Sequence, residues 1–310
     1  MSLRYRRSAA ATLLWLTAQA LAFSAAAQQQ GVSGSYNGRG PEAQIAIIID
    51  DLGLRLEQDL RVLALPGAVT NAILPRATHT QRIAALAQRL GKEVMIHLPM
   101  ESIGYGQLDE GGLTSKMGYE DFERLVASHI AAVPQAVGIN NHMGSLLTSD
   151  NERMRWLMEV ISARRGLYFI DSRTSVNSVA YRYARDQGIP SRARDVFLDN
   201  VLDEAQIEHQ FDRLIALAKR HGQAIAIGHP NRETIAVLER RLPLLAQQGV
   251  ELVAVSDMLR GRPQKLPSPQ EQPQQQPLRV AQRDLFEEFV LQSGVLRMRP
   301  LVQFFHRGVE

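Results

Sequence analysis

The chain contains no cysteine among its 310 residues and only two tryptophans. Without thiols it can form no disulfide bonds, and cysteine nucleophiles and thiolate metal sites are excluded. No GxGxxG or P-loop motif follows the first apolar run of the central region, so nothing in the sequence supports nucleotide binding. These absences leave histidine and carboxylate side chains as the main candidates for chemistry.

The central region of the chain has no excess of basic residues. The whole chain has a net charge of +3 and a pI near 9.3. Between Gln44 and Arg260, however, 24 Lys and Arg residues face 26 Asp and Glu residues, which gives a net charge of −2. The surplus lies in the terminal segments, so we expect no nucleic-acid-binding surface on the central region.

The first 27 residues have the pattern of a secretory signal peptide. Arg4, Arg6 and Arg7 precede an apolar stretch from Ala9 to Phe23, and small residues follow up to Ala27. The apolar stretch is short for a membrane-spanning helix, which needs about 20 residues. We expect cleavage near Ala27 and an exported, periplasmic protein, with an uncleaved anchor as the alternative.

Composition divides the rest of the chain into four parts. A Gln/Gly/Ser-rich linker at 28–43 precedes a globular domain at 44–260. A Pro/Gln-rich linker follows at 261–277, and a tail occupies 278–310. The tail could form a short amphipathic helix, and through it the protein could contact a membrane surface or a partner.

Strand-like and helix-like patterns alternate through the domain. The expected strands are Ile45–Ile49, Thr70–Leu74, Glu93–Ile96, Gly138–Asn140, Leu167–Ile170, Val196–Leu198, Ala224–Ile227 and Val250–Val255. The expected helices are Arg55–Leu65, Thr80–Leu90, Tyr119–Ala132, Asn151–Arg164, Ser178–Gln187, Glu204–His221 and Arg232–Gln247. About eight such repeats predict an α/β fold, a regular or deformed (β/α) barrel rather than an open doubly wound sheet.

The chain is organised around Gln44–Gly53, which reads QIAIIIDDLG. Its five consecutive apolar residues are typical of a strand buried on both faces. Asp50 and Asp51 follow at the carboxyl end, where α/β folds place their chemistry. One of the two could simply cap the next helix. Two carboxylates at the mouth of an apolar strand are costly unless a cation meets them, so a metal site is the better interpretation.

Polar residues follow the other apolar runs in the same way. Each of these runs ends in a histidine, a carboxylate or both: His97 and Glu101, Asn141 and His142, Asp171, and His229. The carboxyl ends of parallel strands meet at one mouth of a barrel. Imidazole and carboxylate groups gathered there suit a divalent ion such as zinc.

The motifs IIIDDLG, IHLPME, NNHMGS, IDSRT and IGHP, taken in order, resemble the divergent polysaccharide deacetylase family. This family is a branch of the glycoside hydrolase/deacetylase superfamily, whose fold is a deformed (β/α) barrel. The resemblance covers about Gln44–Arg260. It implies a hydrolase that removes acetyl groups from a polysaccharide or a peptidoglycan-like substrate with the help of a divalent metal, most simply zinc.

The resemblance also implies roles for the two carboxylates and the first histidine. Asp50 matches the general base and Asp51 a metal ligand. His97 matches the first histidine of the second motif, but Glu101 stands where that motif has its second histidine. The third metal ligand is therefore either His142 or Glu101.

For the later motifs, the resemblance implies the remaining catalytic groups. His229 matches the general acid, and Asp171 resembles the acidic residue that supports it. The usual arginine-proline-tyrosine motif is absent where Asn141–Gly144 stands. We expect a backbone N–H near Met143 and Gly144 to stabilise the oxyanion.

Two other functions fit the same residues. In one, the barrel is a non-catalytic envelope protein that binds a glycan or a partner through a degenerate metal site. In the other, the protein is a metal-assisted glycosidase or amidase that acts on cell-wall material. Barrels host many reactions, so the fold alone does not choose between them.

Overall fold

The computed structural model describes residues 43–104, 108–164 and 166–261. The predicted signal peptide, nearly all of the first linker, the second linker beyond Gly261 and the C-terminal tail lie outside the described residues. The first strand begins at Ala43, so this last residue of the expected linker already belongs to the sheet. In the described part of the chain, no helix is both long and apolar enough to span a bilayer.

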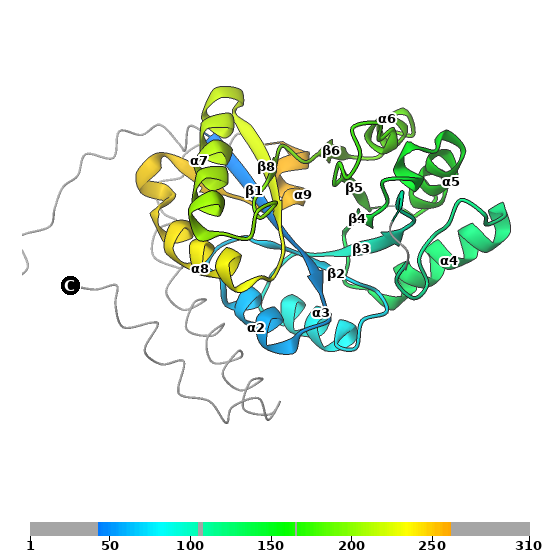
Figure 1. Ribbon diagram of the computed structural model, residues 1–310, viewed down its shortest axis with the longest axis horizontal. Helices are drawn as coiled ribbons and strands as arrows, with labels where there is room; N and C mark the ends of the chain where they lie inside the picture. The colour runs from blue at the N-terminus through cyan, green and yellow to red at the C-terminus, as the bar shows by residue number, and fades with distance from the viewer. Residues whose placement is uncertain (1–42, 105–107, 165, 262–310) are drawn as a thin grey trace, which may run out of the picture. The chain divides into compact units, whose positions relative to one another are not determined.

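The described residues form one parallel sheet with helices along it (Figure 1). The strands are β1 (Ala43–Leu52), β2 (Thr70–Ile73), β3 (Val94–Met100), β4 (Gly138–Met143), β5 (Tyr168–Asp171), β6 (Ser191–Ala193), β7 (Val196–Phe197), β8 (Gln223–Gly228) and β9 (Val250–Leu252). The α-helices are α2 (Leu56–Ala64), α3 (Thr80–Arg89), α4 (Tyr119–Ala132), α5 (Asn151–Ser162), α6 (Ala180–Asp186), α7 (Glu204–His221), α8 (Arg232–Arg241) and α9 (Val255–Arg260). The alternation predicted from the sequence is therefore observed.

The strand β1 holds the sheet together, because it pairs with three others. It lies between β2 and β8, and its first residues also pair with β9. The apolar run of β1 is fully buried, as expected for a strand covered on both faces. Ile45, Ile47 and Ile49 pack in the core between sheet and helices, whereas Ala46 and Ile48 pack in a second, inner core. This division follows from the two-residue period of a strand.

The sheet curls until its two edges come together. Its strand order is β6-β5-β4-β3-β2-β1-β8-β7, so β6 and β7 stand at opposite edges. Only Arg194 and Asp195 separate these two strands, and a chain that short spans roughly 10 Å at most. The Arg194 N–H donates to the carbonyl of Asp171 on β5, while the Asp195 N–H donates to the carbonyl of Ile225 on β8. The fold is the deformed (β/α) barrel that the sequence predicts.

The inner core is closed at the amino ends of the strands by α9. Val255 and Met258 of this helix pack against Ala46 and Ile48. The Val255 N–H donates to Thr70 Oγ1 at the start of β2, which fixes the helix at that end. The polar residues of the candidate site lie at the opposite end, where the strands finish.

Three local predictions differ from the structure. The strand expected over Val250–Val255 ends at Leu252, and Val255 begins the helix α9 instead. The short strand β6 has the sequence Ser-Arg-Ala, which has no apolar run to reveal it. The helix expected over Arg232–Gln247 ends at Arg241 and continues as two 3₁₀ turns, Leu242–Leu244 and Ala246–Gln248. Pro243 explains the break, because a proline inside a helix removes a hydrogen-bond donor and clashes with the preceding turn.

Candidate metal centre and active site

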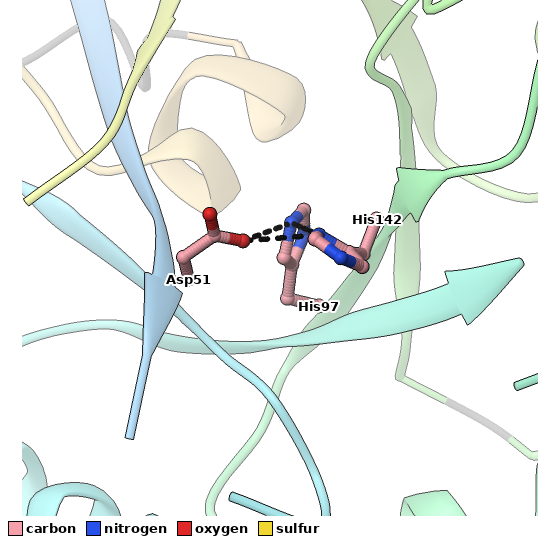
Figure 2. A group of neighbouring side chains, drawn as sticks. All are labelled: Asp51, His97 and His142. Atoms are coloured by element: carbon pink, nitrogen blue, oxygen red, sulfur yellow. Dashed lines mark hydrogen bonds and ion pairs between the residues drawn. The ribbon is translucent and has the colours of Figure 1, made fainter. Parts of the chain in front are cut away.

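Four parallel strands deliver their polar residues to the same end of the barrel. Asp50 and Asp51 lie near the end of β1, His97 lies in β3 and His142 in β4, and His229 directly follows β8. Figure 2 shows the Asp51 carboxylate and the imidazoles of His97 and His142 pointing toward one another from their separate strands. The structure therefore brings together five residues that the sequence singles out.

Asp51, His97 and His142 form a compact triangle of ligand atoms. Asp51 Oδ1 lies 3.2 Å from His97 Nε2 and 3.0 Å from His142 Nδ1. The two imidazole nitrogens lie 3.0 Å apart. In a tetrahedral zinc site with bonds of about 2.0–2.1 Å, neighbouring ligand atoms are about 3.3 Å apart. The triangle has nearly these dimensions.

The local backbone turns both aspartates toward the same histidine. Consecutive side chains on a regular strand point to opposite faces. Here the pairing of β1 with β2 shifts between Ile49 and Leu52, and Asp51 has a φ of 59°. As a result, His97 Nδ1 lies 3.5 Å from Asp50 Oδ1 while its Nε2 faces Asp51. Such left-handed backbone costs free energy and is often found at functional sites.

Strained backbone recurs at this end of the barrel. Among the described residues, the non-glycine residues with positive φ are Asp51, Met143 and Arg173, and each lies at or just beyond the end of a strand. Gly53 follows Asp51 with a φ of 107°, and a Cβ there would lie 2.9 Å from Ala77 Cβ. Its N–H donates to the buried carboxylate of Asp59 on α2. The turn after Asp51 therefore depends on a glycine and on an acceptor oxygen from α2.

Outer partners orient both histidines. His97 Nδ1 lies 2.8 Å from Asn140 Oδ1, and an amide oxygen can only accept, so this nitrogen carries the proton. His142 Nε2 lies 3.0 Å from Asp109 Oδ2, to which a proton on Nε2 would be donated. The other nitrogens, His97 Nε2 and His142 Nδ1, face Asp51 Oδ1. With both imidazoles neutral and protonated on their outer nitrogens, three acceptors would face one point, an arrangement that a bound cation would stabilise.

The residues present fit a divalent cation. Asp51 Oδ1 is buried and has no hydrogen-bond partner among the described residues, although two imidazoles stand beside it. Burial raises the pKa of the Asp51 carboxyl, but the two imidazoles outweigh burial and hold that pKa well below its usual range. The carboxylate is therefore ionised. One carboxylate and two imidazoles are a donor set that zinc accepts, and a tetrahedral ion leaves its fourth position for water or substrate.

Asp50 stands beside the triangle in a different environment. It is only 2% exposed, and Asn140 Nδ2 donates to its Oδ1 at 2.8 Å. Burial raises the pKa of Asp50, and His97 and His229 offset this only in part. A carboxylate with a raised pKa is a better proton acceptor than an ordinary surface carboxylate.

His229 lies beside Asp51 and has its own carboxylate partner. Its Nε2 lies 4.0 Å from Asp51 Oδ2, and its Nδ1 lies 3.0 Å from Asp199 Oδ1. Asp199 Oδ2 also accepts from the His229 N–H and from Thr234 Oγ1. Burial lowers the pKa of His229, but Asp199 outweighs burial and raises it to about 9. His229 is therefore a protonated imidazole at neutral pH and can give up a proton.

Three sequence-based predictions need correction. Asp171 does not support His229: its carboxylate accepts from the N–H of Arg173 and from Ser178 Oγ, and Asp199 contacts His229 instead. The Glu101 carboxylate accepts from the N–H and Oγ of Ser115. His142, and not Glu101, lies with Asp51 and His97 in the group that could hold a metal ion.

The third correction concerns the oxyanion. The Gly144 N–H, one of the donors considered for that role, donates to Ser102 Oγ at 2.9 Å. The Ser145 N–H points to the same hydroxyl at 3.3 Å. These two N–H groups therefore stabilise the loop after β4 through Ser102.

The family model described as divergent polysaccharide deacetylase matches residues 47–259, which includes the whole of this site. The chain belongs to this family. The family is one of hydrolases, and the motifs that carry the sequence resemblance are the ones that supply Asp50, Asp51, His97, His142 and His229.

Two bacterial relatives match along most of the chain. Protein YibQ of Escherichia coli K12, described as uncharacterized, is 42% identical over 216 residues, or 70% of this chain and 67% of its own. An uncharacterized protein of Haemophilus influenzae is 36% identical over 228 residues, or 74% of this chain and 81% of its own. Neither description names a substrate.

A solved structure shares the fold. The crystal structure of the uncharacterized protein ATU2773 from Agrobacterium tumefaciens C58 matches with a TM-score of 0.67 and 26% sequence identity. The match covers 71% of this chain and 90% of that one.

Proposed function

We propose that this protein is an exported, metal-dependent deacetylase that acts on an acetylated glycan of the cell envelope. One observation carries the proposal: the Asp51, His97 and His142 triangle has a buried carboxylate, Asp50, within 3.5 Å of His97 and an imidazole with a raised pKa, His229, within 4.0 Å of Asp51. A metal centre flanked by a base and an acid is the arrangement that hydrolysis of an amide or ester requires. The predicted signal peptide supports export.

Asp51, His97 and His142 would hold the ion, most simply zinc. A divalent ion bound there would lower the pKa of a water molecule and polarise the acetyl carbonyl. With protons on their outer nitrogens, beside Asn140 and Asp109, the two imidazoles would present His97 Nε2 and His142 Nδ1 as ligands.

In this proposal, Asp50 is the proton acceptor and His229 is the proton donor. Asp50 accepts a proton from the attacking water, for which its buried position and raised pKa suit it. His229 donates a proton to the nitrogen or oxygen that leaves as the acetyl group departs. Asp199 keeps His229 charged and fixes the ring through Nδ1, so that Nε2 faces the site.

The proposal is tested with acetylated chitooligosaccharides, acetylated xylan and peptidoglycan fragments, with acetate release measured beside reducing-sugar release. We expect acetate without new reducing ends. The Asp50→Asn variant should lose at least about 100-fold in turnover, a typical contribution of a general base, while it still binds zinc. Reducing ends without acetate would indicate a glycosidase. Full turnover by Asp50→Asn would contradict the role of Asp50.

A further inference from the structure

We propose that Asp109 is the positioning residue for the metal ligand His142, and that it sets how tightly the site holds its ion. This inference rests on the metal centre of the proposed function. Asp109 Oδ2 lies 3.0 Å from His142 Nε2, on the side of the ring away from Asp51. His142 Nδ1 lies 3.0 Å from Asp51 Oδ1. The imidazole is thus held between two carboxylates, one inside the site and one outside it.

Asp109 reaches His142 because the segment after β3 is anchored to the barrel. The Leu113 N–H donates to the carbonyl of Pro99, and the Glu101 N–H donates to the carbonyl of Leu113, both at 2.9 Å. These bonds join the segment to the end of β3. Asp109 lies four residues before Leu113, so β3 limits where its carboxylate can go.

A buried histidine of α4 fixes the same segment from the other side. His129 is only 1% exposed, and its Nε2 donates to the carbonyl of Gly111 at 2.7 Å. Gly111 has a φ of 76°, and a Cβ there would lie 2.6 Å from Arg76 Nε. The buried His129 therefore supports the segment that carries Asp109.

His142 depends on this partner more than His97 depends on its own. The His97 side chain is 2% exposed and lies against Asn140 and Asp50 in the interior. The His142 side chain is 16% exposed, and Asp109 is the only partner of its Nε2 among the described residues. Without Asp109, water competes for Nε2 and the ring is free to turn or to carry its proton on Nδ1. A proton on Nδ1 would block the nitrogen that faces the ion.

The experiment compares zinc affinity of the full-length purified chain and three variants. Metal-free protein is titrated with zinc in competition with a chromogenic chelator. Asp109→Ala should bind zinc about 10- to 100-fold more weakly, the usual effect of removing an outer partner of a metal-binding histidine. Asp109→Asn keeps an acceptor oxygen at the same position and should recover most of the loss. Glu110→Ala, on the same segment and 88% exposed at its side chain, should bind as the wild type does.

Two further readouts separate positioning from folding. Asp109 is 53% exposed at its side chain, so metal-free Asp109→Ala should melt at the wild-type temperature. When cobalt(II) replaces zinc, the visible spectrum of Asp109→Ala should differ from that of the wild type, because the orientation of one ligand has changed.

Wild-type zinc affinity and an unchanged cobalt spectrum in Asp109→Ala would overturn the inference. So would an equal loss in Asp109→Asn and Asp109→Ala. A wild-type chain that binds no zinc would overturn both this inference and the metal-dependent function. If zinc binding is weakened in Asp109→Ala but not in Asp109→Asn or Glu110→Ala, the positioning role stands. If the wild type then releases no acetate from any glycan tested, only the proposed reaction fails.

Discussion

Asn140 joins Asp50 to His97 through the two ends of one side-chain amide. Its Nδ2 donates to Asp50 Oδ1, and its Oδ1 accepts from His97 Nδ1, both at 2.8 Å. The amide is fully buried within β4 and cannot exchange these partners for water. A single residue therefore sets both the orientation of His97, a proposed metal ligand, and the environment of the proposed base.

The Asn140→Asp variant separates the two bonds. A carboxylate at this position still accepts from His97, so zinc should bind as in the wild type. It cannot donate to Asp50, and its charge raises the pKa of Asp50 further, so less of the base is ionised at neutral pH. We expect turnover at pH 7 to fall at least about tenfold, and the acid limb of the pH–rate profile to move to higher pH. A wild-type profile in this variant would contradict the role of the amide.

The pairing of His229 with Asp199 predicts a change at the alkaline end of the profile. In the wild type the pKa of His229 is raised to about 9, so the proton donor is present at neutral pH and is lost as pH rises. Asp199→Asn keeps the shape of the side chain but removes its charge, so the pKa of His229 should fall. Acetate release measured from pH 6 to 10 should decline at lower pH in this variant. Asp171→Asn serves as the comparison and should leave the alkaline limb in place.

Asp59 predicts a pH dependence of stability that is separate from the chemistry. It is fully buried, and burial raises its pKa to about 6 from 3.8. Because the folded-state pKa is raised for an acid, the folded protein binds the proton more tightly, and stability from this group is lost as pH rises from about 4 to 6.

The Asp59→Asn variant should remove this loss. Its free energy of unfolding at pH 7 should exceed that of the wild type by on the order of 1–3 kcal/mol, and the difference should vanish near pH 4. Urea unfolding at several pH values measures it. Glu57→Gln, on the exposed side of the same helix, should show only a small change. A difference that does not depend on pH would count against a buried, titrating Asp59.

The sequence reveals those parts of the fold and site that depend on local pattern. The apolar runs predict the strands, and the residues directly after them include Asp50, Asp51, His97, His142 and His229. A parallel sheet then brings these positions to one end without further information.

What the sequence does not reveal depends on contacts between distant segments. Asp109 lies in a loop, and nothing near it in the sequence shows that it reaches His142. Asp199 follows the expected strand Val196–Leu198 just as Asp171 follows Leu167–Ile170, so the local pattern does not show which of the two contacts His229. The bulge that turns Asp51 toward His97 also has no local signal beyond Gly53.

The most direct test of the metal centre is the zinc content of the purified chain after dialysis against a weak chelator. It is measured beside His97→Ala, His142→Ala and a control, His209→Ala, whose imidazole lies on the exposed side of α7. We predict close to one zinc per chain in the wild type and in His209→Ala, and loss of zinc in the other two variants. A well-folded wild type without zinc, even after zinc is added, or zinc retained in both site variants, would contradict the account.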